Sequence, residues 1–415
     1  MDDYIERLVD LIDPAAQRIR NMTVEEARER VLHGSADSVL GIDGSFALVA
    51  REGKRVRMAR SLDRPMRYFL AKRREGPALI VSDRIDAIHR HLQSEGLDRQ
   101  FHPSYTRFFT PRRNALPTDL DVIGRSYIGA LADETAKWLG ELPPHEPIGV
   151  CFSGGIDSGA VFLTVYHVML KLGLNPSRLK AFTLNLGDGP DLRQAREFLD
   201  RLGLGLFLET IEGDPASLGV EETLRVIEDY KPLDVECASM GLALCRGIRA
   251  RYPQWRFLVD GDGGDENLKD YPIEENPELT IRSVVNNLML YQEGWGVGRI
   301  KHSLTYSGGL SRSYTRTYAP ARSFGFEGFS PFMRPAVVAV AEGIPFAALS
   351  EMSVDRLYSL KGEVVRRGIK AHFGVDMPVF TKRRFQHGAI PVEGLRRRLG
   401  PVESDYRRQY LAIYQ

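Results

Sequence analysis

The sequence of 415 residues is short of cysteine, of net charge and of long apolar runs. Its three cysteines, Cys151, Cys237 and Cys245, are too few and too widely spaced for a disulfide framework or a four-ligand zinc site, so we interpret them as buried apolar side chains. Lysine and arginine number 56 against 55 acidic residues, which leaves no global field for nucleic acid, and we expect no such partner. The apolar stretch 161–170 is half of a bilayer span, and the acidic start 1–4 does not fit a signal peptide. These absences predict a cytoplasmic protein without a membrane partner.

Three common site motifs are missing as well. The chain contains no Gly-x-x-x-x-Gly-Lys-Ser/Thr, which excludes the phosphate loop of kinase-like and GTPase-like proteins. It has no Gly-x-Ser-x-Gly around Ser153, which argues against a serine hydrolase. The acidic run near residue 262 lacks the calcium-loop spacing with a glutamate at position twelve.

The composition that is present indicates two globular domains. Hydrophobic residues make up 43% and charged residues 27% of a chain too long for one ordinary core. We expect a smaller α+β domain over residues 1–117, with strand-like runs at 45–50 and 78–82, and a second domain over 118–415. The proline-containing and arginine-containing stretch 101–117 is interpreted as their connector.

The second domain alternates strand-like and helix-like segments. One strand is expected immediately before Ser153, and a helix over 119–139 precedes it. After Ser153 we expect strands at 180–186, 206–211 and 256–260 and helices at 191–202, 221–230 and 237–251. Strands separated by helices of this length imply parallel crossovers. The predicted fold class is therefore α/β, with a parallel twisted sheet flanked by helices and with ligands at the carboxyl ends of its strands. From residue 272 onward the pattern is mostly helical.

A strand, loop and helix around residue 153 predict a phosphate-binding loop. Glycine allows the backbone to approach a phosphate closely, and hydroxyls, amides and a helix N-terminus attract its oxygens. The carboxylate of Asp157 would repel such a ligand unless a divalent cation lies between them. We therefore expect a nucleotide with Mg²⁺ at this loop, held by Ser153, Gly154, Gly155, Asp157 and Ser158.

A second loop of glycine and acidic residues follows the predicted strand 256–260. It begins at Gly261 and includes Asp262 and Asp265. If both strands are parallel, their carboxyl ends meet at one edge of the sheet, where Asp157 and Asp265 could hold Mg²⁺ on phosphate oxygens.

Together the two loops resemble the asparagine synthetase superfamily, whose phosphate loop is that of the ATP pyrophosphatases. The resemblance covers most of residues 120–390 and implies that fold with ATP and Mg²⁺ as cofactors. In that family a substrate carboxylate attacks the α-phosphorus of ATP, pyrophosphate leaves, and an amine converts the acyl-adenylate to an amide. The resemblance thus implies a carbon–nitrogen ligase whose partners are a small carboxylic or amino acid and ammonia or an amine.

The same resemblance assigns roles to single residues. It implies that Leu184 lies on the adenosine-facing strand, that Lys361 contacts pyrophosphate and that Lys382 stabilises the adenylate and the oxyanion of the second step. Glu327 matches the family's glutamate before Pro-Phe and is the candidate base, with Asp262 assisting. The match is incomplete, because five family positions differ here: Met333 and Arg334 replace Leu-Asp, Phe380 replaces an arginine, and the Leu-Arg after Lys361 is missing.

The first domain resembles a shortened class II glutamine amidotransferase. This resemblance rests on the segments Gly44–Ala47, Ala59–Tyr68 and Val81–Asp83. That family's glutaminase uses an N-terminal cysteine, whereas Asp2 stands at the corresponding place here and no cysteine precedes Cys151. We therefore expect a degenerate domain without glutamine hydrolysis, which could serve as a scaffold or as the interface of a homodimer.

Two other functions remain open from the sequence. ATP pyrophosphatase folds also serve sulfur transferases, and Cys237 and Cys245 lie eight residues apart on a predicted helix, where both could face one cavity. A paralogue that binds ATP without catalysis is the other alternative, although it would have little use for both Asp157 and Asp265.

Overall fold

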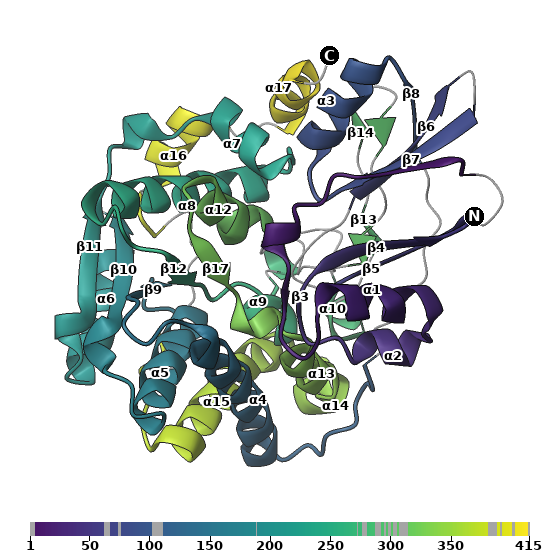
Figure 1. The fold of residues 1–415 in the computed structure, drawn as a ribbon. Coiled ribbons are helices and arrows are strands. Elements are labelled where there is room, and N and C mark those ends of the chain that lie inside the picture. Colours follow the sequence, from purple (N-terminus) through teal and green to yellow (C-terminus); the bar gives the residue numbers. More distant parts are fainter. Residues whose placement is uncertain are drawn as a thin grey trace. The chain divides into compact units, whose positions relative to one another are not determined.

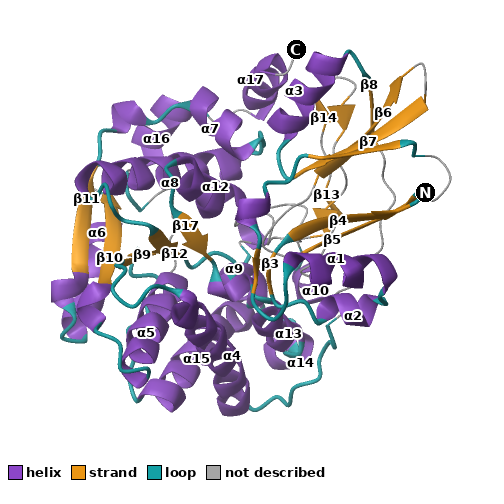
Figure 2. Cartoon of the chain, viewed as in Figure 1, coloured by secondary structure: helices purple, strands orange, loops and turns teal. Residues whose placement is uncertain are grey.

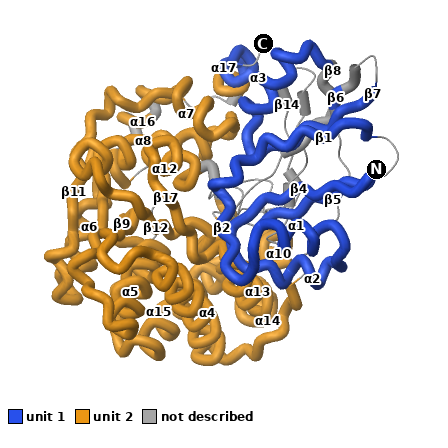
Figure 3. The backbone as a smooth tube through the Cα atoms, in the orientation of Figure 1, with its two compact units in different colours: residues 1–110, 290–314, 408–415 blue, residues 111–289, 315–407 orange. Residues whose placement is uncertain are grey.

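The computed structural model divides into two compact units, coloured in Figure 3. Unit 1 consists of residues 1–110, 290–314 and 408–415, and unit 2 of residues 111–289 and 315–407. Unit 1 thus includes two segments from the second half of the chain, 290–314 and 408–415. A single domain boundary near residue 117 assigns both segments to the second domain. The structure describes these residues: 5–61, 67–73, 76–101, 111–187, 189–271, 273–275, 280–286, 292–293, 296–297, 300–301, 305–306, 314–380, 388–390, 392–400 and 403–413.

Unit 1 has α+β character. Its largest sheet has the strand order β1-β7-β6-β8, in which β1 pairs parallel with β7 and the other pairs are antiparallel. The strands of unit 1 are β1 (Arg7–Asp10), β2 (Arg18–Ile19), β3 (Gly44–Ser45), β4 (Ala47–Glu52), β5 (Arg55–Arg60), β6 (Arg67–Arg73), β7 (Gly76–Ser82), β8 (Asp98–Phe101), β13 (Gln292–Glu293), β14 (Gly296–Val297), β15 (Ile300–Lys301) and β16 (Thr305–Tyr306). Its helices include α1 (Val24–His33), α2 (Ala36–Leu40) and α3 (Ile85–Glu95). Thr23 and Glu26 form a capping box that fixes the start of α1.

Unit 2 is built around a five-stranded sheet in which every pair is parallel. The strand order is β11-β10-β9-β12-β17. The strands are β9 (Ile148–Cys151), β10 (Leu179–Asn185), β11 (Leu208–Glu212), β12 (Phe257–Val259) and β17 (Glu327–Phe329). The central strands are almost wholly buried, with Ile148, Val150 and Val259 at 0% exposure, as expected for a parallel sheet covered on both faces.

Helices surround this sheet in two groups. In Figure 1, α4, α5 and α15 lie below the sheet, whereas α7, α8 and α12 lie above it. Figure 2 shows the same alternation of strands and helices by type. The longer helices of the unit are α4 (Leu120–Glu141), α5 (Ile156–Lys171), α6 (Asp191–Arg201), α7 (Val220–Ile227), α8 (Pro232–Arg251), α13 (Pro335–Glu342), α15 (Val354–Phe373) and α16 (Val392–Leu399). Shorter ones are α9 (Gly264–Asn267), α10 (Ile281–Asn286), α12 (Ala319–Ser323) and α14 (Phe346–Ser350), and α17 (Glu403–Ile413) begins in unit 2 and ends in unit 1.

The predicted α/β fold class is confirmed, including the parallel sheet and its flanking helices. Each predicted strand and helix between residues 119 and 260 is present, with ends shifted by a few residues. The expectation of a mostly helical final third missed five short strands, of which β13 to β16 lie in unit 1. The edge strand β17 comes from that third and pairs with β12.

Candidate active site

The order of strands creates a switch point beside β9. After β9 the chain places β10 and β11 on one side, and then returns to place β12 and β17 on the other. In open α/β sheets the crevice outside the carboxyl ends of the strands at such a point is the usual ligand site. Because β9 and β12 are parallel neighbours, with Val150 opposite Val259, the loops that follow them open at the same place.

The first loop is folded by its own hydroxyl groups. The Ser158 Oγ accepts from the Ser153 amide at 3.2 Å and lies 3.2 Å from the Ser153 Oγ, which accepts from the Gly155 amide at 3.3 Å. Gly154 has φ +72°, and a Cβ there would lie 2.8 Å from the backbone of Ala195, so glycine is required for both reasons. Gly155 caps α5 without a side-chain hydrogen bond, which leaves the positive helix end available to an anion.

The second loop is held by Asp260, a residue that the sequence indicated only as the end of a strand. Its carboxylate accepts from the Asp262 amide at 3.0 Å and from the Ser330 hydroxyl at 2.8 Å. Burial raises the pKa of Asp260 well above its usual value, and the charge of Asp262 adds to this rise. Asp260 therefore ties the loop after β12 to the residue that follows β17.

The carboxylates of Asp157 and Asp265 converge on a single ammonium group. Lys361, which is buried on α15, donates from Nζ to Asp157 Oδ2 at 2.6 Å and to Asp265 Oδ1, and it lies 3.3 Å from Asp270 Oδ2. Burial lowers the pKa of Lys361, but the three carboxylates outweigh burial and hold it well above its usual value. The structure thus brings together two predicted metal ligands and the predicted pyrophosphate contact. Asp270 was not foreseen, because Lys269-Asp270 gives only the signal of a charged turn.

The acidic loop after β12 lies very close to the loop between β9 and α5. A Cβ at Gly264 would lie 2.2 Å from Asp157 Oδ1, and one at Gly261 would lie 3.0 Å from the Ser158 amide. The absence of side chains at these positions lets the acidic loop reach the start of α5.

Asp262 lies beside a half-buried arginine, Arg316. Burial raises the pKa of Asp262 to about 7, although a hydrogen bond from Thr317 and the charge of Arg316 act in the opposite direction. Within the described residues its Oδ2 is buried and has no hydrogen-bond partner. Arg316, on the π-helical turn η7 (Tyr314–Tyr318), donates from Nε to Asp234 on α8 at 3.2 Å. A carboxyl that titrates near neutrality is suited to accept a proton in catalysis.

Glu327 is not part of this group. It lies opposite Phe257 at the amino ends of β12 and β17, the far edge of the sheet from the acidic loop. Its carboxylate pairs with Arg256 at 3.0 Å, and Arg256 also pairs with Glu146 at 3.3 Å. This placement argues against the predicted role of Glu327 as the base, because the strand itself separates it from Asp262.

The predicted nucleotide contact Leu184 and the predicted adenylate contact Lys382 are not among the residues that meet at Lys361. Leu184 is buried in β10, one residue before the carboxyl end of that strand. Lys382 lies outside the described residues. The residues just beyond it dock at the end of β10, since the Ala389 carbonyl accepts from the Leu186 amide at 3.1 Å and the Gly388 carbonyl accepts from the Asp191 amide at 3.0 Å.

The donor set fits a metal that arrives with phosphate. Within the described residues no group of three or more His, Cys, Asp or Glu side chains has the arrangement of a metal site. Asp157 and Asp265 supply two hard oxygen ligands, which suits Mg²⁺, since this ion usually keeps waters and substrate phosphates as its other ligands. The fit is therefore to a magnesium nucleotide rather than to a permanently bound ion.

The cysteines are all in unit 2 and are poorly reactive. Burial raises the pKa of the Cys237 and Cys245 thiols to about 12 in each case and raises that of Cys151 well above its usual value. Thiolate formation, on which nucleophilic sulfur chemistry depends, is disfavoured at all three.

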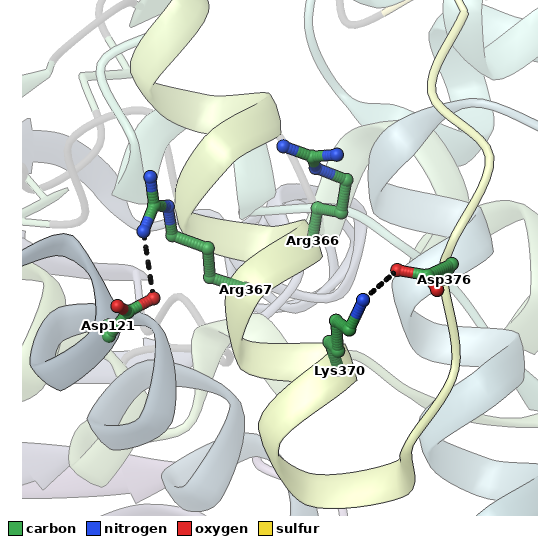
Figure 4. A pocket seen from close by; sticks show the side chains of 5 residues that line it. All are labelled: Asp121, Arg366, Arg367, Lys370 and Asp376. Carbon is green, nitrogen blue, oxygen red and sulfur yellow. Dashed lines mark hydrogen bonds and ion pairs between the residues drawn. The ribbon is translucent and has the colours of Figure 1, made fainter.

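A pocket of 310 Å³ lies elsewhere in unit 2 (Figure 4). It is lined by Asp121, Arg366, Arg367, Lys370 and Asp376. Figure 4 shows Arg367 directed to Asp121 and Lys370 to Asp376, ion pairs of 2.9 and 2.7 Å. It shares no residue with the two loops.

Comparison with known proteins gives a consistent result for this part of the chain. Residues 144–321 match the family model described as asparagine synthase. A root asparagine synthetase of Pisum sativum is 26% identical over 48% of this chain and 32% of its own length, and one of Lotus japonicus is 28% identical over 30% and 22%. The human enzyme is 26% identical over 35% of this chain and 26% of its own length. The chain thus matches a third or less of the length of each of these relatives.

A solved structure of NMN synthetase from Francisella tularensis is 13% identical and covers 64% of this chain and 99% of that chain, with a TM-score of 0.25, too low to bear on the fold. Within the described residues, no helix combines the length and the apolarity that a membrane span requires. The family model and the curated relatives agree with the two loops and the parallel sheet. Residues 144–321 are therefore similar to the asparagine synthase family, and this similarity agrees with the resemblance of the two loops to the asparagine synthetase superfamily.

Proposed function

We propose that the protein is an ATP-dependent carbon–nitrogen ligase that adenylates a carboxylate, releases pyrophosphate and transfers the acyl group to ammonia or an amine. The observation that carries this proposal is the convergence of Asp157 and Asp265 on Lys361 at the switch point of the sheet. Phosphate binding alone would not need two carboxylates in that position. Their presence indicates a site that handles a polyphosphate together with a cation.

In the first step the Ser153–Ser158 loop binds the phosphates. Its glycines allow close approach, and the start of α5 adds a partial positive charge to the charge of Lys361. Asp157 and Asp265 hold Mg²⁺, which when bound neutralises charge on the phosphate oxygens. Donors fixed before the reaction stabilise the developing charge by about 3 kcal/mol for each well-placed group.

In the second step a base must take a proton from the attacking amine. We assign this role to Asp262, because its pKa of about 7 matches neutral conditions and its buried Oδ2 has no hydrogen-bond partner within the described residues. Lys382 remains the proposed oxyanion contact, on the resemblance alone. Leu184 and Gly261 remain proposed nucleotide contacts, and Glu327 has no role in this proposal.

The nitrogen donor is proposed to be free ammonia or an amine carried by a substrate. Glutamine hydrolysis by a cysteine in unit 1 is not available, because the sequence of that unit contains no cysteine. The same observation leaves unit 1 as a scaffold or an interface between two copies of the chain.

Sulfur transfer has less support. Cys237 and Cys245 are buried, and a thiol whose pKa is about 12 has a very small thiolate fraction near neutral pH. A protein that only binds ATP would not need Asp262 beside the phosphate loops. Neither alternative has an observation in its favour.

Product analysis tests the proposal. The protein is incubated with Mg-ATP, ammonium and a panel of amino and dicarboxylic acids, and the phosphorus products are resolved by ³¹P NMR. We expect AMP and pyrophosphate to form with one class of acid and to require that acid. Formation of ADP and phosphate would overturn the adenylation mechanism, and turnover with sulfide but not with ammonium would favour sulfur transfer.

A further inference from the structure

Lys361 stands where the proposed metal would bind. In the structure its ammonium contacts the same two carboxylates, Asp157 and Asp265, that are proposed to hold Mg²⁺. The contacts use one oxygen of each carboxylate, Asp157 Oδ2 and Asp265 Oδ1, and one ammonium and one metal ion cannot both lie between these two oxygens. A metal ion that bridges this pair of oxygens therefore requires that Lys361 moves.

The third carboxylate gives the ammonium a place to remain. Asp270 Oδ2 lies 3.3 Å from Lys361 Nζ, and the Asp270 side chain is 8% exposed, whereas those of Asp157 and Asp265 are 21% and 35% exposed. The two carboxylates that would exchange partners are thus the ones that solvent and phosphates reach. Asp270 lies on the buried side, and its backbone amide donates to the Asp265 carbonyl at 2.9 Å, which fixes it to the same loop.

The charges of the four side chains favour the entry of a divalent cation. Three carboxylates and one ammonium leave an excess of two negative charges, which a divalent cation balances, and Asp270 can keep the ammonium within the cluster when it leaves the other two carboxylates. Displacing the ammonium costs free energy, because Lys361 loses its charge-assisted hydrogen bonds to Asp157 and Asp265. A free cation must offset this cost by its own binding to the two carboxylates. A cation bound to a nucleotide also brings phosphate oxygens, which accept hydrogen bonds from the displaced ammonium.

We infer that Lys361 is a specificity-determining residue of the metal site: it competes with free divalent cations for Asp157 and Asp265, and it yields to a cation that arrives with nucleotide phosphates. The inference rests on the proposed metal role of these two aspartates. Asp270 acts as the positioning residue that retains the ammonium.

The test is a titration with Mn²⁺ alone, without nucleotide, followed by electron paramagnetic resonance of the free ion. We compare wild type with Lys361→Met and with the double variant Lys361→Met/Asp270→Asn. The double variant removes one cation and one anion, so its cluster has the same net charge as that of wild type. Lys269→Met is the matched control, because Lys269 is a buried lysine whose ammonium lies 3.3 Å from Glu342 rather than from the loop carboxylates.

We expect Mn²⁺ to bind both Lys361 variants at least about tenfold more tightly than wild type, because each no longer breaks two hydrogen bonds to a charged group. Lys269→Met should bind Mn²⁺ as wild type does. If Lys361→Met does not fold, as judged by circular dichroism, the charge-balanced double variant carries the test. Affinity of the double variant equal to that of wild type would overturn the inference.

The outcome is separable from that of the proposed function. Tighter Mn²⁺ binding by the variants, together with no acid-dependent release of pyrophosphate by wild type, would support the competition and remove the ligase proposal. Acid-dependent release of pyrophosphate with unchanged Mn²⁺ binding would keep the ligase proposal and overturn the competition.

Discussion

The two edges of the parallel sheet in unit 2 carry similar charges in different environments. At the carboxyl edge, Asp260 and Lys361 are each 2% exposed, and Asp262 is half-buried with its Oδ2 buried. At the amino edge, the side chains of Arg256 and Glu327 are 50% and 37% exposed. Burial raises the pKa of Asp260 and of Asp262, and three carboxylates raise that of Lys361, whereas solvent screens the exposed pair at the amino edge. The comparison teaches that the position of a charged residue along its strand, rather than its presence in a motif, decides whether it can take part in chemistry.

The largest expected effect comes from removing a carboxylate at the carboxyl edge. Asp157→Asn or Asp265→Asn takes away one of two proposed metal ligands while keeping the size of the side chain. We expect acid-dependent formation of AMP and pyrophosphate to fall by about 10² to 10³-fold. The rate is measured at saturating Mg-ATP, with circular dichroism to verify the fold. A loss smaller than fivefold in both variants would contradict the proposed metal pair.

Asp262→Asn separates the two chemical steps. We expect amide formation to fall by about 10²-fold, because the amine loses its base, while adenylation changes by less than about fivefold. The pH dependence gives a second readout. Below the pKa of about 7 the Asp262 carboxyl is protonated and cannot accept a proton, so amide formation in wild type should rise with pH through about 7.

The asparagine variant should lose that dependence. The charged groups facing Asp262 come from the η7 turn, from the loop itself and from α9, and they include Arg316, Asp260, Asp265 and Glu266. Measuring both half-reactions between pH 5.5 and 8.5 checks the assignment. An unchanged rise in the variant would move the base role to another residue.

Gly264→Ala tests the close approach of the loops. The added Cβ would meet the Asp157 carboxylate at 2.2 Å, so this side chain must move. We expect the KM for Mg-ATP to rise by about tenfold, which corresponds to about 1.4 kcal/mol. Gly219→Ala is the control, because the nearest atom to its Cβ lies 3.9 Å away. Equal KM values for the two variants would show that the contact has no effect on nucleotide binding.

The smallest expected effect is at the amino edge. Glu327→Gln removes a charge from an exposed pair with Arg256, and such pairs contribute about 0 to 1 kcal/mol to stability. We expect both chemical steps to change by less than about twofold, and they are measured beside Asp262→Asn under the same conditions. A loss comparable with that of Asp262→Asn would restore the sequence-based assignment of Glu327 as the base.

Much of unit 2 could be predicted because its signals are local. Strands β9, β10, β11 and β12 have apolar runs bounded by turns, and two acidic loops at the ends of parallel neighbours must meet. Strand β17 has only three residues, which is too few for an alternating pattern of apolar residues to distinguish it from the helices around it. The sequence-based role of Glu327 was assigned without this strand, since only the register of β17 shows at which edge of the sheet the glutamate lies.

Contacts between distant parts of the chain were harder to predict. Lys361 is 204 residues from Asp157, and only the resemblance suggested that it belonged to the site. Asp270 had no sequence signal, because charged residues in turns are normally solvated, and the position of Arg316 beside Asp262 did not follow from its place in the sequence. Their roles follow from burial, which depends on how α15 and η7 pack in the folded unit.

The most direct test of the account is the exchange of ³²P-pyrophosphate into ATP across a panel of amino and dicarboxylic acids, with wild type, Asp157→Asn and Glu327→Gln in parallel. The account predicts exchange that depends on one class of acid, that is lost in Asp157→Asn and that persists in Glu327→Gln. Exchange that survives in Asp157→Asn, or no exchange with any acid despite bound ATP, would contradict it.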